Sequence, residues 1–169
     1  STPKPSSAAS DVYKRQQERN GENGKIFKCY KFRSMKVNAL SDSLQATKND
    51  PRKTKFGNFL RKSNLDELPQ FINVFKGEMS IVGPRPHMLK HTEEYSQLIN
   101  KYMMRHLVKP GITGWAQVTG YRGETKELSQ MEGRVRRDLW YIENWTFLLD
   151  IRIMIKTVTN MFRGEKNAY

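Results

Sequence analysis

Residues 63–86, SNLDELPQFINVFKGEMSIVGPRP, form the segment around which the rest of the chain is organised. Ser63 or Asn64 can cap a helix, and apolar residues follow at helical spacing. Asp66 and Glu67 then fall in the first turn of that helix, where the positive end of the helix dipole favours the ionised form of a carboxylate. The segment therefore predicts two ionised carboxylates at the start of a helix, an arrangement that suits a nucleophile or a metal ligand.

The same segment ends in Gly83-Pro84-Arg85-Pro86, a loop that places one arginine between two prolines. Each proline fixes its own backbone angle φ, so the arginine is held in one direction, as a phosphate clamp should be. Both features also have ordinary explanations, because acidic residues commonly complement a helix dipole and proline commonly opens a helix. Their closeness in a strongly basic chain is what favours a functional site.

The composition limits the kind of protein. The 169 residues are enough for one domain. With 30 Lys and Arg against 17 Asp and Glu, the formal net charge is +13, which attracts polyanions such as nucleic acid, lipid headgroups and nucleotide phosphates. The single cysteine, Cys29, excludes an internal disulfide, and together with only three histidines it makes a structural zinc site unfavourable.

One hairpin is expected before the central segment. Residues 26–35 predict a strand in which Lys31 and Arg33 share one face, so that two cations can line a polar cleft. Asn23-Gly24 suits the turn before this strand. Together with the helical patterns in the rest of the chain, these features predict an α+β fold, a mostly helical domain with a small β-hairpin or sheet. The other expected elements are a polar helix or loop over 37–55, a helix over 87–107, an extended segment over 109–118, a helix over 128–142 and a helix from about residue 145.

The chain carries, in order, YKFRSM at 30–35, LDELPQ at 65–70, VGPRP at 82–86, KPGITGWAQV at 109–118 and KNAY at 166–169. These motifs resemble those of the bacterial sugar transferase family, the monotopic polyprenyl-phosphate hexose-1-phosphate transferases. Within the family, the likeness is greatest to the undecaprenyl-phosphate glucose phosphotransferases of colanic-acid-type exopolysaccharide synthesis.

The resemblance implies a domain organisation. Residues 1–16, rich in Ser, Ala, Pro and Lys, are expected to be a disordered or foreign leader, and residues 17–169 the catalytic domain. Family members carry an apolar re-entrant membrane helix just upstream, so the resemblance implies a catalytic fragment that lacks this helix. It also implies a membrane-associated domain at the cytoplasmic face of the bacterial inner membrane, because a polyprenyl acceptor stays in the bilayer.

The resemblance also implies a reaction. A hexose-1-phosphate, with glucose favoured, passes from a UDP-sugar to undecaprenyl phosphate, which initiates an exopolysaccharide or capsule repeat unit. In that reaction Asp66 attacks the sugar-side phosphate, UMP leaves, and the covalent phosphosugar is handed to the lipid. Glu67 is the second catalytic residue and the expected ligand of Mg²⁺, a cation that takes carboxylate and phosphate oxygens.

The substrate contacts come from the same resemblance. Arg122 lies between two glycines, which would let its backbone approach a ligand closely. The basic residues of 37–55, together with Arg61 and Lys62, can face lipid headgroups, but a solvated face is the favoured interpretation for most of them. A homodimer is a possible assembly. The expected substrate-binding residues are Lys31, Arg33, Arg85, Gln117, Arg122, Arg137, Asp138 and Tyr141.

Two other functions are compatible with the residues alone. A basic domain could stack Tyr30, Phe32 and Trp115 on the bases of nucleic acid, but this leaves the carboxylate pair and Arg85 unexplained, so no nucleic-acid partner is expected. A non-catalytic domain that binds a membrane surface is the other alternative. His87, His91 and Glu94 can share one side of a helix and resemble a metal cluster. Metal binding there is not favoured, because histidine-rich helix faces without a third close ligand are usually polar surface.

Overall fold

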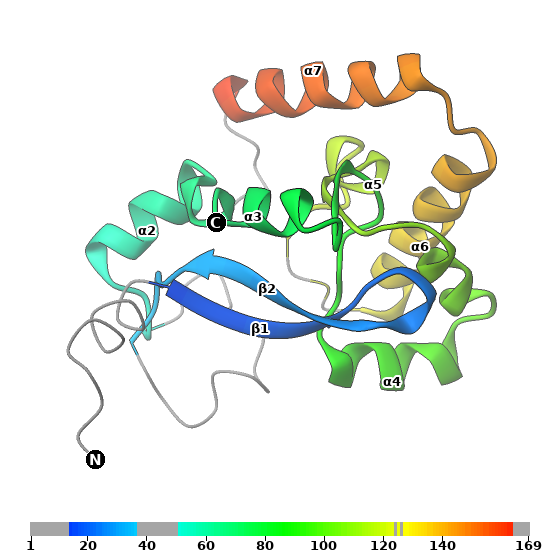
Figure 1. Cartoon of the computed structure of the whole chain (residues 1–169), viewed down its shortest axis with the longest axis horizontal. Coiled ribbons are helices and arrows are strands. Elements are labelled where there is room, and N and C mark those ends of the chain that lie inside the picture. Colours follow the sequence, from blue (N-terminus) through cyan, green and yellow to red (C-terminus); the bar gives the residue numbers. More distant parts are fainter. Residues whose placement is uncertain (1–13, 37–50, 124, 126, 164–169) are drawn as a thin grey trace.

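The computed structural model describes residues 14–36, 51–123, 125 and 127–163, and in them an α+β arrangement of helices around two small sheets (Figure 1). The predicted polar segment 37–55 is therefore described only from residue 51 onward. The strands are β1 (Lys14–Asn20), β2 (Ile26–Phe32), β3 (Ser80–Val82) and β4 (Gly111–Thr113). The helices are α2 (Lys55–Lys62), α3 (Gln70–Phe75), α4 (Leu89–Leu98), α5 (Trp115–Val118), α6 (Leu128–Glu143) and α7 (Phe147–Arg163), with 3-10 turns η1 (Glu22–Gly24), η2 (Leu65–Glu67) and η3 (Tyr102–Leu107).

Strands β1 and β2 form the predicted antiparallel hairpin, in register from Lys14 opposite Phe32 to Asn20 opposite Ile26. The connection uses Asn23 and Gly24, whose φ angles of 54° and 74° are those that an Asn-Gly turn supplies. Strand β1 begins at Lys14, so the hairpin extends into the segment 1–16 that the sequence assigned to a leader.

The helix predicted after Ser63 is divided into η2 and α3. Asn64, with φ of 58°, precedes η2 and caps nothing with its side chain, and Pro69 precedes α3. The division has a physical cause, because Pro69 has no amide hydrogen to bond to Leu65. The neighbouring amides instead bond three residues back, as from Leu68 to the Leu65 carbonyl. Gly77, with φ of 75°, follows the end of α3 as predicted.

A second sheet, parallel β3 and β4, was not predicted. Gly83 and Gly111 bring the two backbones together so closely that a Cβ on Gly111 would lie 2.1 Å from the Gly83 nitrogen. The extended segment predicted over 109–118 is right for β4 and wrong beyond it, because residues from Trp115 form α5. Elements of three or four residues leave too short a pattern for periodicity to distinguish them.

The helix predicted over 87–107 is also two elements. Helix α4 ends at Leu98, and Lys101, with a left-handed φ of 61°, separates it from η3. Helices α6 and α7 lie where the sequence predicted them. The core is divided accordingly, with one cluster between α5, α6 and α7, a second between α4, η3 and α6, and a third between β2 and α3.

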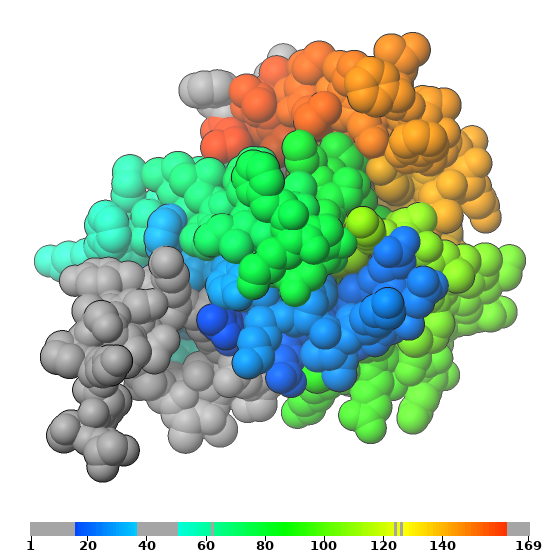
Figure 2. All heavy atoms as spheres, viewed as in Figure 1, coloured from blue at the N-terminus to red at the C-terminus, as the bar shows by residue number. Residues whose placement is uncertain are grey.

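The elements lie in a simple spatial order. Helices α2 and α3 lie on one side of the hairpin, α4 lies on the other, and α7 runs along the edge beyond α3 and α5 (Figure 1). On the face in Figure 2, the hairpin and α3 lie side by side. Within the described residues, none of the helices combines the length and the apolar character needed to cross a membrane.

Candidate active site

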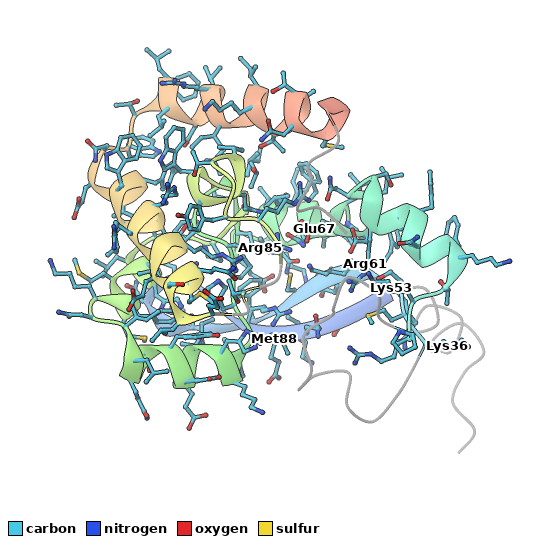
Figure 3. The ribbon with its side chains drawn as sticks, turned by 180° about the vertical axis from the view of Figure 1, so that it is seen from behind. Lys36, Lys53, Arg61, Glu67, Arg85 and Met88 are labelled. Atoms are coloured by element: carbon cyan, nitrogen blue, oxygen red, sulfur yellow. The ribbon has the colours of Figure 1, made fainter. Side chains whose placement is uncertain are left out.

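Asp66 and Glu67 lie next to each other in η2 and are 7% and 9% exposed. Both Glu67 oxygens accept hydrogen bonds from cations: Lys31 Nζ lies 2.8 Å from Oε1, and Arg85 Nη2 and Nη1 lie 2.5 Å from Oε1 and 3.2 Å from Oε2. Figure 3 shows Arg85 beside Glu67, with Arg61 nearby on the α2 side. Over the part of the chain that the structure describes, the Asp66 carboxylate accepts no hydrogen bond, so it is the uncommitted member of the pair.

The two carboxylates differ in pKa. Burial raises the pKa of Asp66, and although the nearby charges of Lys31, Arg61 and Arg85 act against it, they do not reverse it. Burial also acts to raise the pKa of Glu67, but the charges and hydrogen bonds of Arg85 and Lys31 hold it well below the ordinary value. The two carboxylates therefore differ in the direction of their pKa shift, because at Asp66 desolvation outweighs the neighbouring cations whereas at Glu67 the two bonded cations outweigh desolvation.

Lys31 reaches Glu67 because α3 is fixed against β2. Asn73 is fully buried, and its Oδ1 accepts from the Tyr30 backbone amide at 3.0 Å while its Nδ2 donates to the Lys28 carbonyl at 2.8 Å. A second Nδ2 hydrogen goes to Glu78 Oε2 at 2.7 Å. No role was predicted for Asn73 from the sequence, because its neighbours at helical spacing, Gln70 and Lys76, are polar and suggest an exposed side of the helix.

Arg61 was also missed as a site residue, since it was interpreted as one of several basic residues that are solvated or face lipid headgroups. It projects from α2 and donates from Nε to Ser34 Oγ at 2.8 Å, and its charge partly offsets the rise that burial causes in the pKa of Asp66. Helix α2 comes this close because Gly57 packs against the Ser34 backbone, where a Cβ would lie 1.9 Å from the carbonyl oxygen.

Arg122 supports the turn that carries Asp66. Its Nη2 donates to Asn64 Oδ1, and Asn64 is the left-handed residue that begins η2. The loop of Arg122 is in turn held by Arg134, which donates to the carbonyls of Tyr121 and Gly123 at 3.1 and 3.0 Å. Of the predicted substrate contacts, Lys31, Arg85 and Arg122 are thus brought to the Asp66–Glu67 turn.

The other predicted contacts have different surroundings. Gln117 is buried in α5, where its Nε2 donates to Ile112, and Arg33 is half-buried just beyond β2. Arg137 lies 3.9 Å over the Tyr121 ring. Asp138 is paired with Arg105 at 2.6 Å, and the Tyr141 hydroxyl donates to Asp150 at 2.7 Å. A substrate-binding role for these residues stays a prediction.

Asp66 and Glu67 are also the described carboxylates of the site that could serve Mg²⁺. The described residues contain no cluster of three or more His, Cys, Asp or Glu side chains that could hold a metal. Such a cluster is not required, because Mg²⁺ in phosphate chemistry commonly takes one or two carboxylates plus substrate phosphates and water. Asp66 and Glu67 fit this pattern, with the condition that Glu67 must release one cation to bind the ion.

An uncommitted buried carboxylate beside several cations defines a class of site, one that can bind a phosphate ester and attack it. The chain belongs to the bacterial sugar transferase family, whose model matches residues 7–164. This match confirms the resemblance seen in the sequence.

Three relatives show the range of the similarity. A UDP-glucose:undecaprenyl-phosphate glucose-1-phosphate transferase of Escherichia coli (strain K12) is 60% identical over 156 residues, 90% of this chain and 33% of the relative. Exopolysaccharide production protein PSS of Rhizobium leguminosarum bv. phaseoli is 43% identical over 88% of this chain and 78% of its own length. An Aeromonas hydrophila UDP-N-acetylgalactosamine-undecaprenyl-phosphate N-acetylgalactosaminephosphotransferase is 40% identical over 88% of this chain and 35% of the relative. The chain thus spans about a third of the first and third relatives.

Proposed function

We propose that the chain transfers a hexose-1-phosphate, with glucose as the preferred sugar, from a UDP-sugar to undecaprenyl phosphate, and so starts an exopolysaccharide repeat unit. The observation that carries the proposal is the Asp66 carboxylate, which is buried, has a raised pKa and accepts no hydrogen bond from the described residues. A carboxylate that has lost much of its hydration is a stronger nucleophile than a solvated one.

The first step is an exchange at the sugar-side phosphorus. A bond forms from an Asp66 oxygen to that phosphorus, the bond from phosphorus to the bridging oxygen breaks, and UMP leaves with the electron pair. An oxygen of undecaprenyl phosphate then attacks the same phosphorus and releases Asp66. Charge balance is kept without a proton donor, because both leaving groups are stable anions at neutral pH.

The cations around Glu67 supply the binding energy for phosphate. Lys31 and Arg85 are 20% and 30% exposed at their side chains, so a ligand can reach them. A bound diphosphate would compete with Glu67 for these two cations, which would leave Glu67 as a residue that could hold Mg²⁺. The ion, when bound, would neutralise charge on the transferred phosphoryl group.

The test is UMP release from UDP-glucose with undecaprenyl phosphate in detergent, with and without Mg²⁺. The wild-type chain, Asp66→Asn and the exposed-carboxylate control Glu132→Gln are compared. We expect Mg²⁺-dependent release that Asp66→Asn abolishes and Glu132→Gln retains, together with a hexose-phosphate adduct on the peptide that contains Asp66. If UMP release survives Asp66→Asn, Asp66 is not the nucleophile. Membrane binding without turnover would favour the non-catalytic alternative.

We also propose that helices α2, α3 and α7 dock on the cytoplasmic face of the bacterial inner membrane. Large apolar side chains are exposed on all three, including Phe56 at 68%, Phe75 at 91% and Leu148 at 75%. Phe56 and Phe59 stack on each other, with ring centroids 6.4 Å apart. Exposed apolar groups in a chain of net charge +13 suit an anionic lipid surface.

Flotation with anionic vesicles tests this docking. Phe56→Ser with Phe59→Ser should lower the vesicle-bound fraction. A matched pair, Leu98→Ser with Leu107→Ser, removes similarly exposed side chains from α4 and η3 and should not. Equal losses from both pairs would contradict the assignment of this face. Association into a homodimer stays a prediction, which sedimentation of the detergent-solubilised chain can measure.

A further inference from the structure

A second cluster of charged and polar side chains lies behind the site and is almost completely buried. Arg105 and Asp138 are each 2% exposed, His87 is 6% exposed and Tyr102 is 1% exposed. Arg105 and Tyr102 come from η3, Asp138 from α6 and His87 from the residues after the Pro84-Arg85-Pro86 loop. Three segments distant in sequence therefore meet at one guanidinium.

Arg105 is the centre of this cluster. Its Nη2 donates to Asp138 Oδ2 at 2.6 Å and to the Arg85 backbone carbonyl at 2.8 Å. Its Nη1 lies 2.5 Å from His87 Nδ1, which is also 2.6 Å from the Tyr102 hydroxyl. Because a guanidinium only donates, His87 Nδ1 accepts and the ring is neutral. Burial and the Arg105 charge agree with this, since both lower the pKa of His87 well below its ordinary value.

The contact with Arg85 links this cluster to the phosphate-binding cations. The Pro84 carbonyl accepts from the Gly111 amide at 2.9 Å, and the Arg85 carbonyl accepts from Arg105. Proline at 84 and at 86 removes further backbone freedom. The loop backbone is thus held from both sides, while the Arg85 side chain extends the other way to Glu67.

Stability alone does not explain the cluster. A buried ion pair can often be replaced by apolar side chains at no cost in stability. This cluster is also incompletely satisfied, because Arg105 Nε and His87 Nε2 are buried and bond to none of the described residues. What an apolar pair cannot do is donate to the Arg85 carbonyl.

We propose that Arg105, held by Asp138, is a positioning residue that fixes the Arg85 backbone and so aims the Arg85 guanidinium at the substrate phosphates. This inference rests on the proposed function. Asp138, expected from the sequence to touch substrate, acts in this arrangement through Arg105. His87 contributes as a neutral acceptor that keeps the Arg105 guanidinium in its plane.

A double-mutant cycle on Mg²⁺-dependent UMP release tests the inference. We expect Arg105→Lys alone to lower kcat/KM by about 100-fold, the typical cost of misplacing a binding group. In an Arg85→Ala background the same change should cost less than about 2-fold, because its target is gone. Val135→Ala is the control, because it destabilises the core beside Tyr102 without touching the Arg85 carbonyl. It should change kcat/KM by the same factor in the wild type and in the Arg85→Ala background. If Arg105→Lys lowers kcat/KM by the same factor in the Arg85→Ala background as in the wild type, the proposal is overturned.

A second measurement does not depend on turnover. Hydrogen exchange of the Gly111 amide, which donates to the Pro84 carbonyl next to Arg85, should speed up at least about 10-fold in Arg105→Lys and stay unchanged in Val135→Ala. If Arg105→Lys fails to fold, the apolar pair Arg105→Met with Asp138→Leu replaces it and should fold with the same fast exchange. Failure of that pair to fold, or slow exchange in it, overturns the proposal. Absence of UMP release in the wild type would contradict the proposed function, and exchange alone would then decide the positioning role.

Discussion

Replacing Glu67 by Gln tests whether this carboxylate organises the site. The substitution keeps the side-chain shape but removes the negative charge that Lys31 and Arg85 share. Loss of one partner costs about 3–5 kcal/mol in a fully buried pair and about 0–1 kcal/mol in an exposed one. Glu67 is 11% exposed at its side chain and its partners are 20% and 30% exposed, so we expect an intermediate loss of about 2 kcal/mol.

The loss should depend on pH in a defined direction. The pKa of Glu67 is lowered in the folded chain, so its stabilisation is complete above the unfolded pKa of about 4.3 and disappears as the pH falls through the folded value. The wild type should therefore exceed Glu67→Gln in stability at pH 7 and approach it in acid. Glu132→Gln, at an exposed position of α6, should change stability by less than about 0.5 kcal/mol.

Urea unfolding followed by circular dichroism measures these differences in the free energy of unfolding. In thermal unfolding at pH 7, the expected loss of about 2 kcal/mol corresponds to a decrease in Tm of about 4–8 °C for a domain of this size. A difference between wild type and Glu67→Gln that stays constant from pH 7 down to the acid range would refute the reasoning. It would mean that Glu67 stabilises the fold by shape and hydrogen bonding rather than by its charge.

Three further substitutions have expected results in thermal unfolding. Asp66→Asn should raise the Tm at pH 7, because burial raises the Asp66 pKa and its ionised form loses stability as pH rises through that value; a lowered Tm would contradict this. Asn73→Ala should cost about 2–4 kcal/mol, since it leaves the Tyr30 amide and Lys28 carbonyl unbonded, and a loss below about 0.5 kcal/mol would exclude the role given to it. Gly57→Ala should destabilise by about 2–3 kcal/mol because its Cβ meets the Ser34 carbonyl, whereas helix propensity alone predicts a gain of about 1 kcal/mol.

The sequence predicted those features that local chemistry decides. The turn at Asn23-Gly24 follows from the positive φ that these residues tolerate. The family resemblance named Lys31 and Arg85 as phosphate contacts of the site, but their ion pairs with Glu67 were not predicted. The long helices α6 and α7 were predicted because each repeats its apolar spacing over several turns.

The features that the sequence missed depend on contacts between distant segments. The β3–β4 pair exists because glycines allow two backbones to touch, which no single segment encodes. Arg61 and Arg105 are ordinary basic residues of a basic chain until the fold carries them to Ser34 and to the Arg85 carbonyl. The raised pKa of Asp66 was missed for the same reason, since burial is a property of the packed chain.

The charges at the site give a physical reason to expect a divalent cation. Lys31, Arg61 and Arg85, the cations that act on Asp66, carry +3. With Asp66 in its ionised, nucleophilic form, the two carboxylates carry −2, so 3 − 2 leaves +1 before substrate binds. A diphosphate brings two negative charges and changes the balance to 1 − 2 = −1, which would raise the Asp66 pKa further and favour its inactive, protonated form. Mg²⁺, when bound, would restore the balance to +1 and so favour the ionised form of Asp66. We therefore expect the pH dependence of UMP release to shift to higher pH as Mg²⁺ is lowered. An unshifted profile would mean that the cation acts on the leaving group without affecting the ionisation of Asp66.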